Sequence, residues 1–171
     1  MTHNPIAAKQ TRRARNEKLF RRAANYEEQR DMRSAFRLYL EAAKNGDSGS
    51  QLNVGNLYDA GDGVRRNREA ALYWYKRAYR RGSGTAANNI GVLWRNEKKP
   101  KLALEWFRKA VRLGDDEANL EIALHYLLEE RHPAKAVPYL ERVRKSSWVT
   151  QAGAEKAARL LLGIRKQSKR V

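Results

Sequence analysis

The sequence predicts an all-α protein, a right-handed α-solenoid of about four helical hairpins followed by a closing C-terminal helix. Three observations predict this fold class. The segment from Ser48 to Gly114 contains one pattern of small and aromatic residues twice, and the pattern extends to both sides of that segment. Within each copy the small and aromatic residues are spaced three residues apart, as on one face of a helix. Repeats of this length are typical of stacked helical pairs.

The two best copies align residue by residue. Counting 36 residues onward pairs Gly55 with Gly91, and counting 32 onward pairs Trp74 with Trp106. The offset falls by four because the connector at 61–64 is shortened in the second copy. Weaker copies precede and follow them. We therefore expect hairpins at 16–46, 47–82, 83–114 and 115–147, then a closing helix at 148–164, with a flexible basic arm at 1–15 and a basic tail at 165–171.

Each hairpin follows the same packing rule in chain order. Its first helix carries a small residue three positions before an aromatic one: Ala23 and Tyr26, Gly55 and Tyr58, Gly91 and Trp94, Ala123 and Tyr126. The two share one helix face, so a neighbouring element can approach the small site beside the ring. Glycines suited to a left-handed C-cap close the first three hairpins, and short polar residues follow them as N-caps: Gly46 and Asp47, Gly82 and Ser83, Gly114 and Asp115.

At 51–64, Gln-Leu-Asn-Val-Gly-Asn-Leu-Tyr-Asp-Ala-Gly-Asp-Gly-Val, and at 70–78 the chain resembles a Sel-one-like repeat. That is the sub-family of tetratricopeptide-like solenoids with a Gly-x-Gly-Val connector. The resemblance is strong over 48–114, fair over 16–46 and weaker over 115–147. It implies a superhelical adaptor whose first helices line a concave groove. Carried onto this chain, the groove positions implied to bind a partner include Arg21, Asn53, Asn56, Asn89 and Arg95.

The groove asparagines have two interpretations. Asparagine both donates and accepts hydrogen bonds, so these residues suit the backbone of an extended peptide. The alternative is that they satisfy polar groups between packed helices, which is where most buried side-chain amides find partners.

The charge is the second informative feature. The chain has 36 Lys and Arg against 19 Asp and Glu, a net charge of +17. The surplus gathers at both ends and in the connector of the second hairpin, giving these candidate partner-binding residues: Arg12, Arg13, Arg15, Arg65, Arg66, Arg68, Lys166, Lys169 and Arg170. Basic residues near helix ends also complement the helix dipole, and basic termini aid solubility. The size of the excess favours an acidic partner, either a protein or a nucleic acid.

We therefore predict a non-enzymatic protein–protein interaction module, an adaptor or scaffold that binds a peptide or an acidic protein surface. One alternative is electrostatic, sequence-independent nucleic-acid binding; another is a dedicated inhibitor or immunity-type protein that caps a partner. We expect no catalytic residues, cofactor or metal, because the three histidines are scattered and cysteine is absent. The sequence shows neither a secretory signal nor a membrane span, so we expect a cytoplasmic protein. The alternative is that the Arg-rich, acid-poor start is a targeting segment. The oligomeric state stays open.

Overall fold

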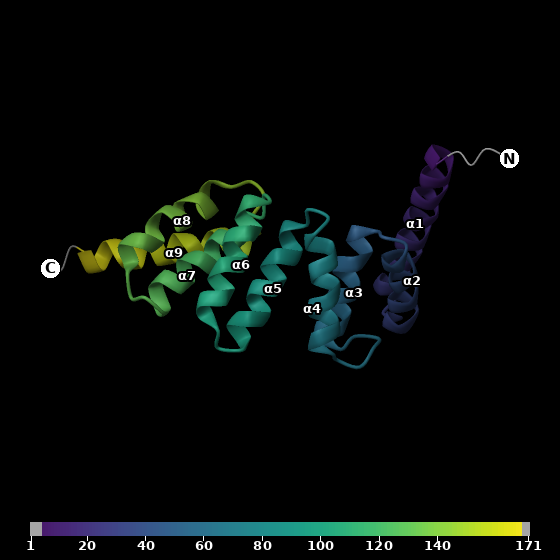
Figure 1. Cartoon of the computed structure of the whole chain (residues 1–171). Helices are drawn as coiled ribbons and strands as arrows, with labels where there is room; N and C mark the ends of the chain where they lie inside the picture. The colour runs from purple at the N-terminus through teal and green to yellow at the C-terminus, as the bar shows by residue number, and fades with distance from the viewer. Residues whose placement is uncertain (1–4, 169–171) are drawn as a thin grey trace. The chain divides into compact units, whose positions relative to one another are not determined.

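A computed structural model of the chain describes residues 5–168, which form nine α-helices and no strand (Figure 1). The predicted all-α class of repeated hairpins is confirmed. The contacts divide the chain into two compact units, the first up to Ser83 and the second from Gly84. Repeat proteins favour such a division because each hairpin contacts only its neighbours.

The first unit holds four helices, each packed on the next along the chain. They are α1 (Pro5–Glu28), α2 (Met32–Lys44), α3 (Ser48–Ala60) and α4 (Arg68–Tyr79). Its core combines buried Ala23, Tyr39 and Val54 with Trp74. Two edge-to-face ring pairs fill the space beside it, Phe20 on Tyr39 and Phe36 on Tyr58, with ring centroids 5.3 and 5.2 Å apart. Such pairs add to the stabilisation by burial.

The second unit holds five helices, again packed in chain order. They are α5 (Gly84–Asn96), α6 (Pro100–Arg112), α7 (Ala118–Leu128), α8 (Pro133–Lys145) and α9 (Gln151–Ser168). Ile90, Phe107, Ile122 and Leu140 are almost fully buried in its core. The closing helix α9 contributes Ala157 and Leu161, so the last hairpin does not present its apolar face to water.

The predicted helix ends are confirmed at the residues that the pattern marks. Gly46, Gly82 and Gly114 have φ angles of 91°, 90° and 82°, the left-handed region that suits glycine at a C-cap. The Asp47 carboxylate accepts the Ser50 N–H at 2.7 Å, and the Asp115 carboxylate accepts the Ala118 N–H at 3.1 Å. Each cap satisfies one N–H group that the helix leaves without an acceptor.

The ends of the chain require a correction. The segment 1–15, predicted as a flexible arm, is helical from Pro5 onward as part of α1, and α9 continues past the predicted end at 164 to Ser168. The physical reason is local: 6–15 is rich in alanine, lysine, glutamine and arginine, which are strong helix formers, so the basic character does not interrupt the helix. Within residues 5–168, no helix combines the length and apolar character needed to cross a bilayer.

Candidate partner-binding surfaces

The predicted groove asparagines of the first unit are bonded to tyrosines of the second helices. The Tyr75 hydroxyl donates to Oδ1 of Asn56 at 2.9 Å. The Tyr39 hydroxyl donates to the Glu27 carboxylate at 2.9 Å and also shares a hydrogen bond with the Asn53 side chain. Burial first, and then the bond to Glu27, raise the pKa of Tyr39, so the phenol stays neutral and keeps donating. These asparagines therefore help to join first helices to second helices.

The other groove positions differ in exposure. Arg21 is exposed, and its guanidinium lies 3.8 Å from the Glu17 carboxylate one turn earlier in α1. Asn89 is half-buried in α5. Arg95, at the end of α5, forms an ion pair with Glu121 of α7. These placements leave Arg21 and Arg95 as the groove candidates with exposed charge.

Arg95 and Glu121 border an apolar pocket that the sequence analysis does not predict. It has a volume of about 250 Å³ and lies between α5, α6 and α7. Its apolar lining is formed by Pro100, Ala103, Phe107, Leu124 and Leu128. The pocket therefore joins a charged rim to an apolar floor, which suits a side chain that is part apolar and part polar.

The three connector arginines are not equivalent. Nε of Arg66 donates to the carbonyl oxygen of Asp59 at 2.8 Å, and its guanidinium lies 3.9 Å from the Asp59 carboxylate. Arg66 therefore holds the connector against the end of α3. Arg68 is the half-buried first residue of α4, and Arg65 is exposed. Arg65 is thus exposed and forms no ion pair with the described residues.

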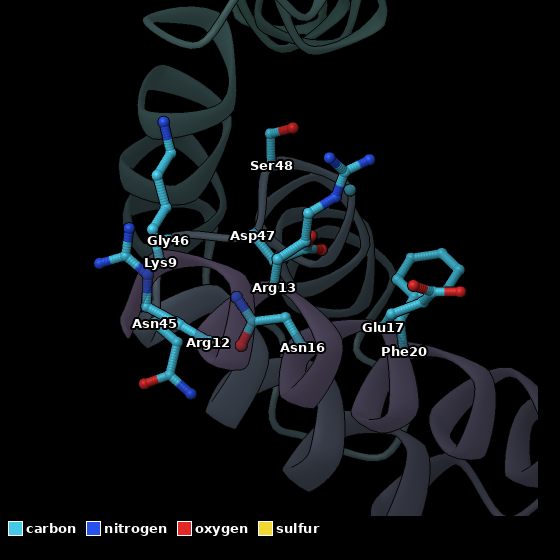
Figure 2. A pocket seen from close by; sticks show the side chains of 11 residues that line it. Lys9, Arg12, Arg13, Asn16, Glu17, Phe20, Asn45, Gly46, Asp47 and Ser48 are labelled. Carbon is cyan, nitrogen blue, oxygen red and sulfur yellow. The ribbon is translucent and has the colours of Figure 1, made fainter. Parts of the chain in front are cut away.

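The basic residues near the N-terminus lie on α1. Arg15 is paired with Glu41 of α2 at 2.7 Å. Arg12 and Arg13 lie with Lys9 along a pocket of about 470 Å³, whose opposite wall is the turn from α2 into α3 at 45–49 (Figure 2). Lys9, Arg12 and Arg13 have no ion-pair partner among the residues that the structure describes. We call this the cationic pocket; it is lined by three basic residues, Lys9, Arg12 and Arg13, and by two acidic ones, Glu17 and Asp47. A second basic pocket on α1 is lined by Lys18, Arg21 and Arg22.

The predicted C-terminal patch is described only in part. Lys166 is exposed on the last turn of α9. Lys169 and Arg170 lie outside the described residues. Lys166 lines none of the three pockets described above.

Sequence reasoning missed two members of the cationic pocket, Lys9 and Asn16. A signal was present, because Lys9, Arg12, Arg13 and Asn16 follow the three- and four-residue spacing of one helix face. This spacing indicates a common face only in a helix, and the segment 1–15 is expected from the sequence to be flexible. Across the described part of the chain, no group of three histidine, aspartate or glutamate side chains is placed to hold a metal ion.

Stacked α-helical hairpins with charged outer surfaces define an α-helical repeat protein. The Sel1 repeat matches residues 26–47, 48–83 and 86–115, about half of the chain. The chain belongs to the Sel1 repeat family, which confirms the resemblance seen in the sequence. Sel1 repeats are typically a non-catalytic fold that binds other proteins.

Relatives agree with this assignment. Over 87 residues the chain is 31% identical to a putative sel1-like repeat-containing protein, L21, of Acanthamoeba polyphaga mimivirus; the match covers 51% of this chain but only 16% of that relative. A Sel1 repeat protein from Oxalobacter formigenes has a similar structure, with a TM-score of 0.68 at 22% identity, over 84% of this chain and 72% of the other.

The protective antigen c5321 of uropathogenic Escherichia coli, which displays an SLR fold, gives a TM-score of 0.69 at 20% identity. That similarity covers 79% of this chain and 32% of the antigen. At these identities the two solved structures bear on the fold alone.

Proposed function

We propose that the chain is a non-enzymatic interaction module, an adaptor or scaffold, and that it binds an acidic protein surface. The observation that carries this proposal is the cationic pocket, which Lys9, Arg12 and Arg13 line without forming an ion pair to any described residue. Charges left unpaired on one face of a helix attract an acidic partner and speed its arrival. The net charge of +17 adds a long-range attraction of the same sign.

The groove supports a protein partner in a second way. In the second unit, the apolar pocket beside Arg95 offers shelter for a hydrophobic side chain, while the Arg95–Glu121 pair offers polar contacts at its rim. Protein interfaces combine an apolar centre with a polar rim in this manner. A nucleic acid strand has no aliphatic side chain to place there.

Nucleic-acid binding is the competing function. The placement of the aromatic side chains argues against a site where bases could stack. Proteins that bind single strands use exposed aromatic faces on which bases stack. Most rings here are in the packing between helices, and Tyr73 at 53% exposure is engaged: its hydroxyl accepts from Arg77 and its ring meets Trp74 edge-on at 5.1 Å. Trp148 is 87% exposed, but it lines a pocket with Asp115, Asp116 and Glu117, whose charge repels a phosphate backbone.

The test is affinity capture by the whole chain from a lysate of the organism that encodes it, at two salt concentrations, with and without nuclease. The wild type is compared with Arg12→Glu/Arg13→Glu and with Lys101→Glu/Arg112→Glu, a matched reversal of two exposed charges in the second unit. The proposal predicts that the wild type captures an acidic protein, and that nuclease does not reduce this capture. Only Arg12→Glu/Arg13→Glu should lose the captured protein. Retention that disappears with nuclease supports nucleic-acid binding instead, and equal loss in both variants contradicts a defined basic site.

A further inference from the structure

We propose that the cationic pocket between α1 and the start of α3 binds a phosphomonoester, the phosphate of a phosphoserine or phosphothreonine on the partner. This inference rests on the proposed function, since it names the group by which an acidic protein partner is held. It is argued from three features of the pocket: its backbone donors, a buried amide without a partner, and its balance of charge.

The backbone donors come from the first turn of α3. The first N–H groups of a helix have no acceptor within the helix, and the Asp47 carboxylate takes only the one from Ser50. Ser48 and Gly49, which carry the two preceding N–H groups, both line the pocket. Helix N-termini bind phosphate through such N–H groups together with the helix dipole.

The buried amide is the independent observation. Asn16 on α1 is 7% exposed and lines the same pocket, and among the residues that the structure describes its Oδ1 has no hydrogen-bond partner. Figure 2 shows Asn16 on the same stretch of α1 as Arg12 and Arg13, facing the turn at Asn45–Ser48. Buried polar groups nearly always have a partner, so this amide indicates that something else supplies one.

A phosphomonoester can meet the donor end of that amide, because its oxygens accept from Nδ2. It offers three free oxygens and continues into the peptide on one side only, whereas a phosphodiester is extended by a chain on both sides. A phosphate at the end of a side chain therefore suits this pocket better than a continuous phosphodiester backbone.

The cations favour phosphate over a carboxylate. Lys9, Arg12 and Arg13 line the pocket together with Glu17 and Asp47, which gives the lining a net charge of +1. Asp47 is engaged as an N-cap and Glu17 lies near Arg21. A phosphomonoester carries about −1.5 to −2 at neutral pH and has three acceptor oxygens, whereas a carboxylate carries −1 and has two. Phosphate can therefore pair with more of the three cations than an acidic side chain can.

The second unit provides an internal control. Its equivalent turn, which leads from α6 into α7, also borders a pocket, of about 490 Å³, but places Asp115, Asp116 and Glu117 where the first unit has Asp47, Ser48 and Gly49. No lysine or arginine lines that pocket. Oδ1 of Asn88, which lines that pocket, also has no hydrogen-bond partner among the described residues, so the two pockets share an unpartnered amide oxygen and differ in charge. Because the charge of the second pocket repels phosphate, binding at the first unit alone is expected.

The experiment measures fluorescence anisotropy of three labelled peptides with the full chain, identical except for serine, aspartate or phosphoserine at the centre of an acidic sequence. We expect the phosphoserine peptide to bind about tenfold or more tightly than the serine and aspartate peptides, as one or more charge-assisted hydrogen bonds predict. Asn16→Ala and Arg12→Gln/Arg13→Gln should remove most of that preference. Lys101→Gln/Arg112→Gln, in the second unit, should leave it unchanged.

Two further readouts keep the inference open to refutation if Asn16→Ala fails to fold. In the wild type, phosphoserine peptide should shift the amide NMR signals of Ser48 and Gly49 and leave those of Asp116 and Glu117 in place. Equal affinity for all three peptides overturns the phosphate site while leaving the proposed function intact. Phosphate-dependent shifts confined to the second unit overturn it as well, and so does tight binding of an oligonucleotide with no preference among the peptides.

Discussion

The ring of Tyr75 occupies the space that a side chain on Gly55 would need. A Cβ on Gly55 would lie 2.5 Å from both Cδ1 and Cε1 of that ring, and Gly91 stands in the same relation to Phe107. The two glycines align in the repeat, and each receives a ring from the second helix of its own hairpin. The small residue of the repeat thus sets how closely the two helices of a hairpin approach.

Gly55→Ala should destabilise the protein by ~1–3 kcal/mol, the cost of overpacking a close-packed site. The Tyr75 hydroxyl is bonded to Asn56, so the ring cannot move aside without losing that bond. The free energy of unfolding in urea measures the change. Gly163→Ala in α9 is the control, because nothing lies within 4 Å of its Cβ and alanine favours a helix interior by ~0.5–1 kcal/mol. Equal stability of the two variants would contradict the packing role of Gly55.

Gly63→Ala should cost more than Gly82→Ala. Both residues have positive φ, 69° and 90°, so alanine is strained at either position by ~1–2 kcal/mol. A Cβ on Gly63 would also clash with the carbonyl oxygen of Met32, whereas nothing lies within 4 Å of a Cβ on Gly82. The extra backbone clash should add ~1–3 kcal/mol to the loss measured by urea unfolding. Equal losses would show that the connector does not pack on the start of α2.

Trp74→Ala should lower the free energy of unfolding by ~3–5 kcal/mol, as expected for a large side chain removed from a core. Trp74 is 7% exposed and belongs to the core of the first unit. Trp148→Ala, at a residue 87% exposed, should change stability by no more than ~0.5 kcal/mol. A loss below ~1 kcal/mol for Trp74→Ala means that the repeat alignment is wrong.

Asp115 and Asp31 should affect stability with opposite dependence on pH. Burial raises the pKa of Asp115, only partly offset by hydrogen bonds from Thr85 and the Ala118 N–H. A raised pKa means that the folded state holds its proton longer than the unfolded state, so this contribution is present at low pH and is lost as pH rises through the folded pKa. Asparagine keeps a capping oxygen and does not ionise. The stability of Asp115→Asn relative to wild type should therefore rise from pH 4 to pH 7.

The hydrogen bonds from Ser34 lower the pKa of Asp31, so its contribution is present at neutral pH and is lost as pH falls through the folded pKa. The loss of stability in Asp31→Asn relative to wild type should therefore grow as pH rises from about 2 to about 5, across the ordinary pKa of aspartate. Urea midpoints at pH 4 and pH 7 measure the difference for Asp115→Asn, and midpoints at about pH 2 and pH 5 measure the difference for Asp31→Asn. If the stability of both variants relative to wild type changed in the same direction as pH rises, Asp31 and Asp115 would not differ in burial as described.

The fold was largely predictable because its signals are local and periodic. Gly46, Gly82 and Gly114 mark helix ends through a backbone conformation that only glycine adopts easily, and each is found there. The start of α1 was not predicted, because the charge of 1–15 was weighed above its helix propensity. The structure gives the bounds of the helices, whereas the bounds of the hairpins remain predictions.

The candidate sites were less predictable, because a side chain's partners lie far away in sequence. Asn53 and Asn56 were chosen as groove residues, yet their bonds to Tyr39 and Tyr75 depend on how second helices are placed. Asn16 reads as one polar residue in a basic helix, and its burial follows only when α1 packs on the turn before α3. A role of the predicted residues in binding stays a prediction.

The most direct test of an acidic protein partner is the rate of association of the captured partner with the full chain, measured by stopped flow at low and moderate salt. Arg12→Glu/Arg13→Glu should slow association by about tenfold or more at low salt, while dissociation changes less, because exposed charges act mainly on the encounter. Lys101→Glu/Arg112→Glu, with the same change in net charge, should slow it much less. An association rate unaltered by the first variant, or reduced equally by both, would contradict the account.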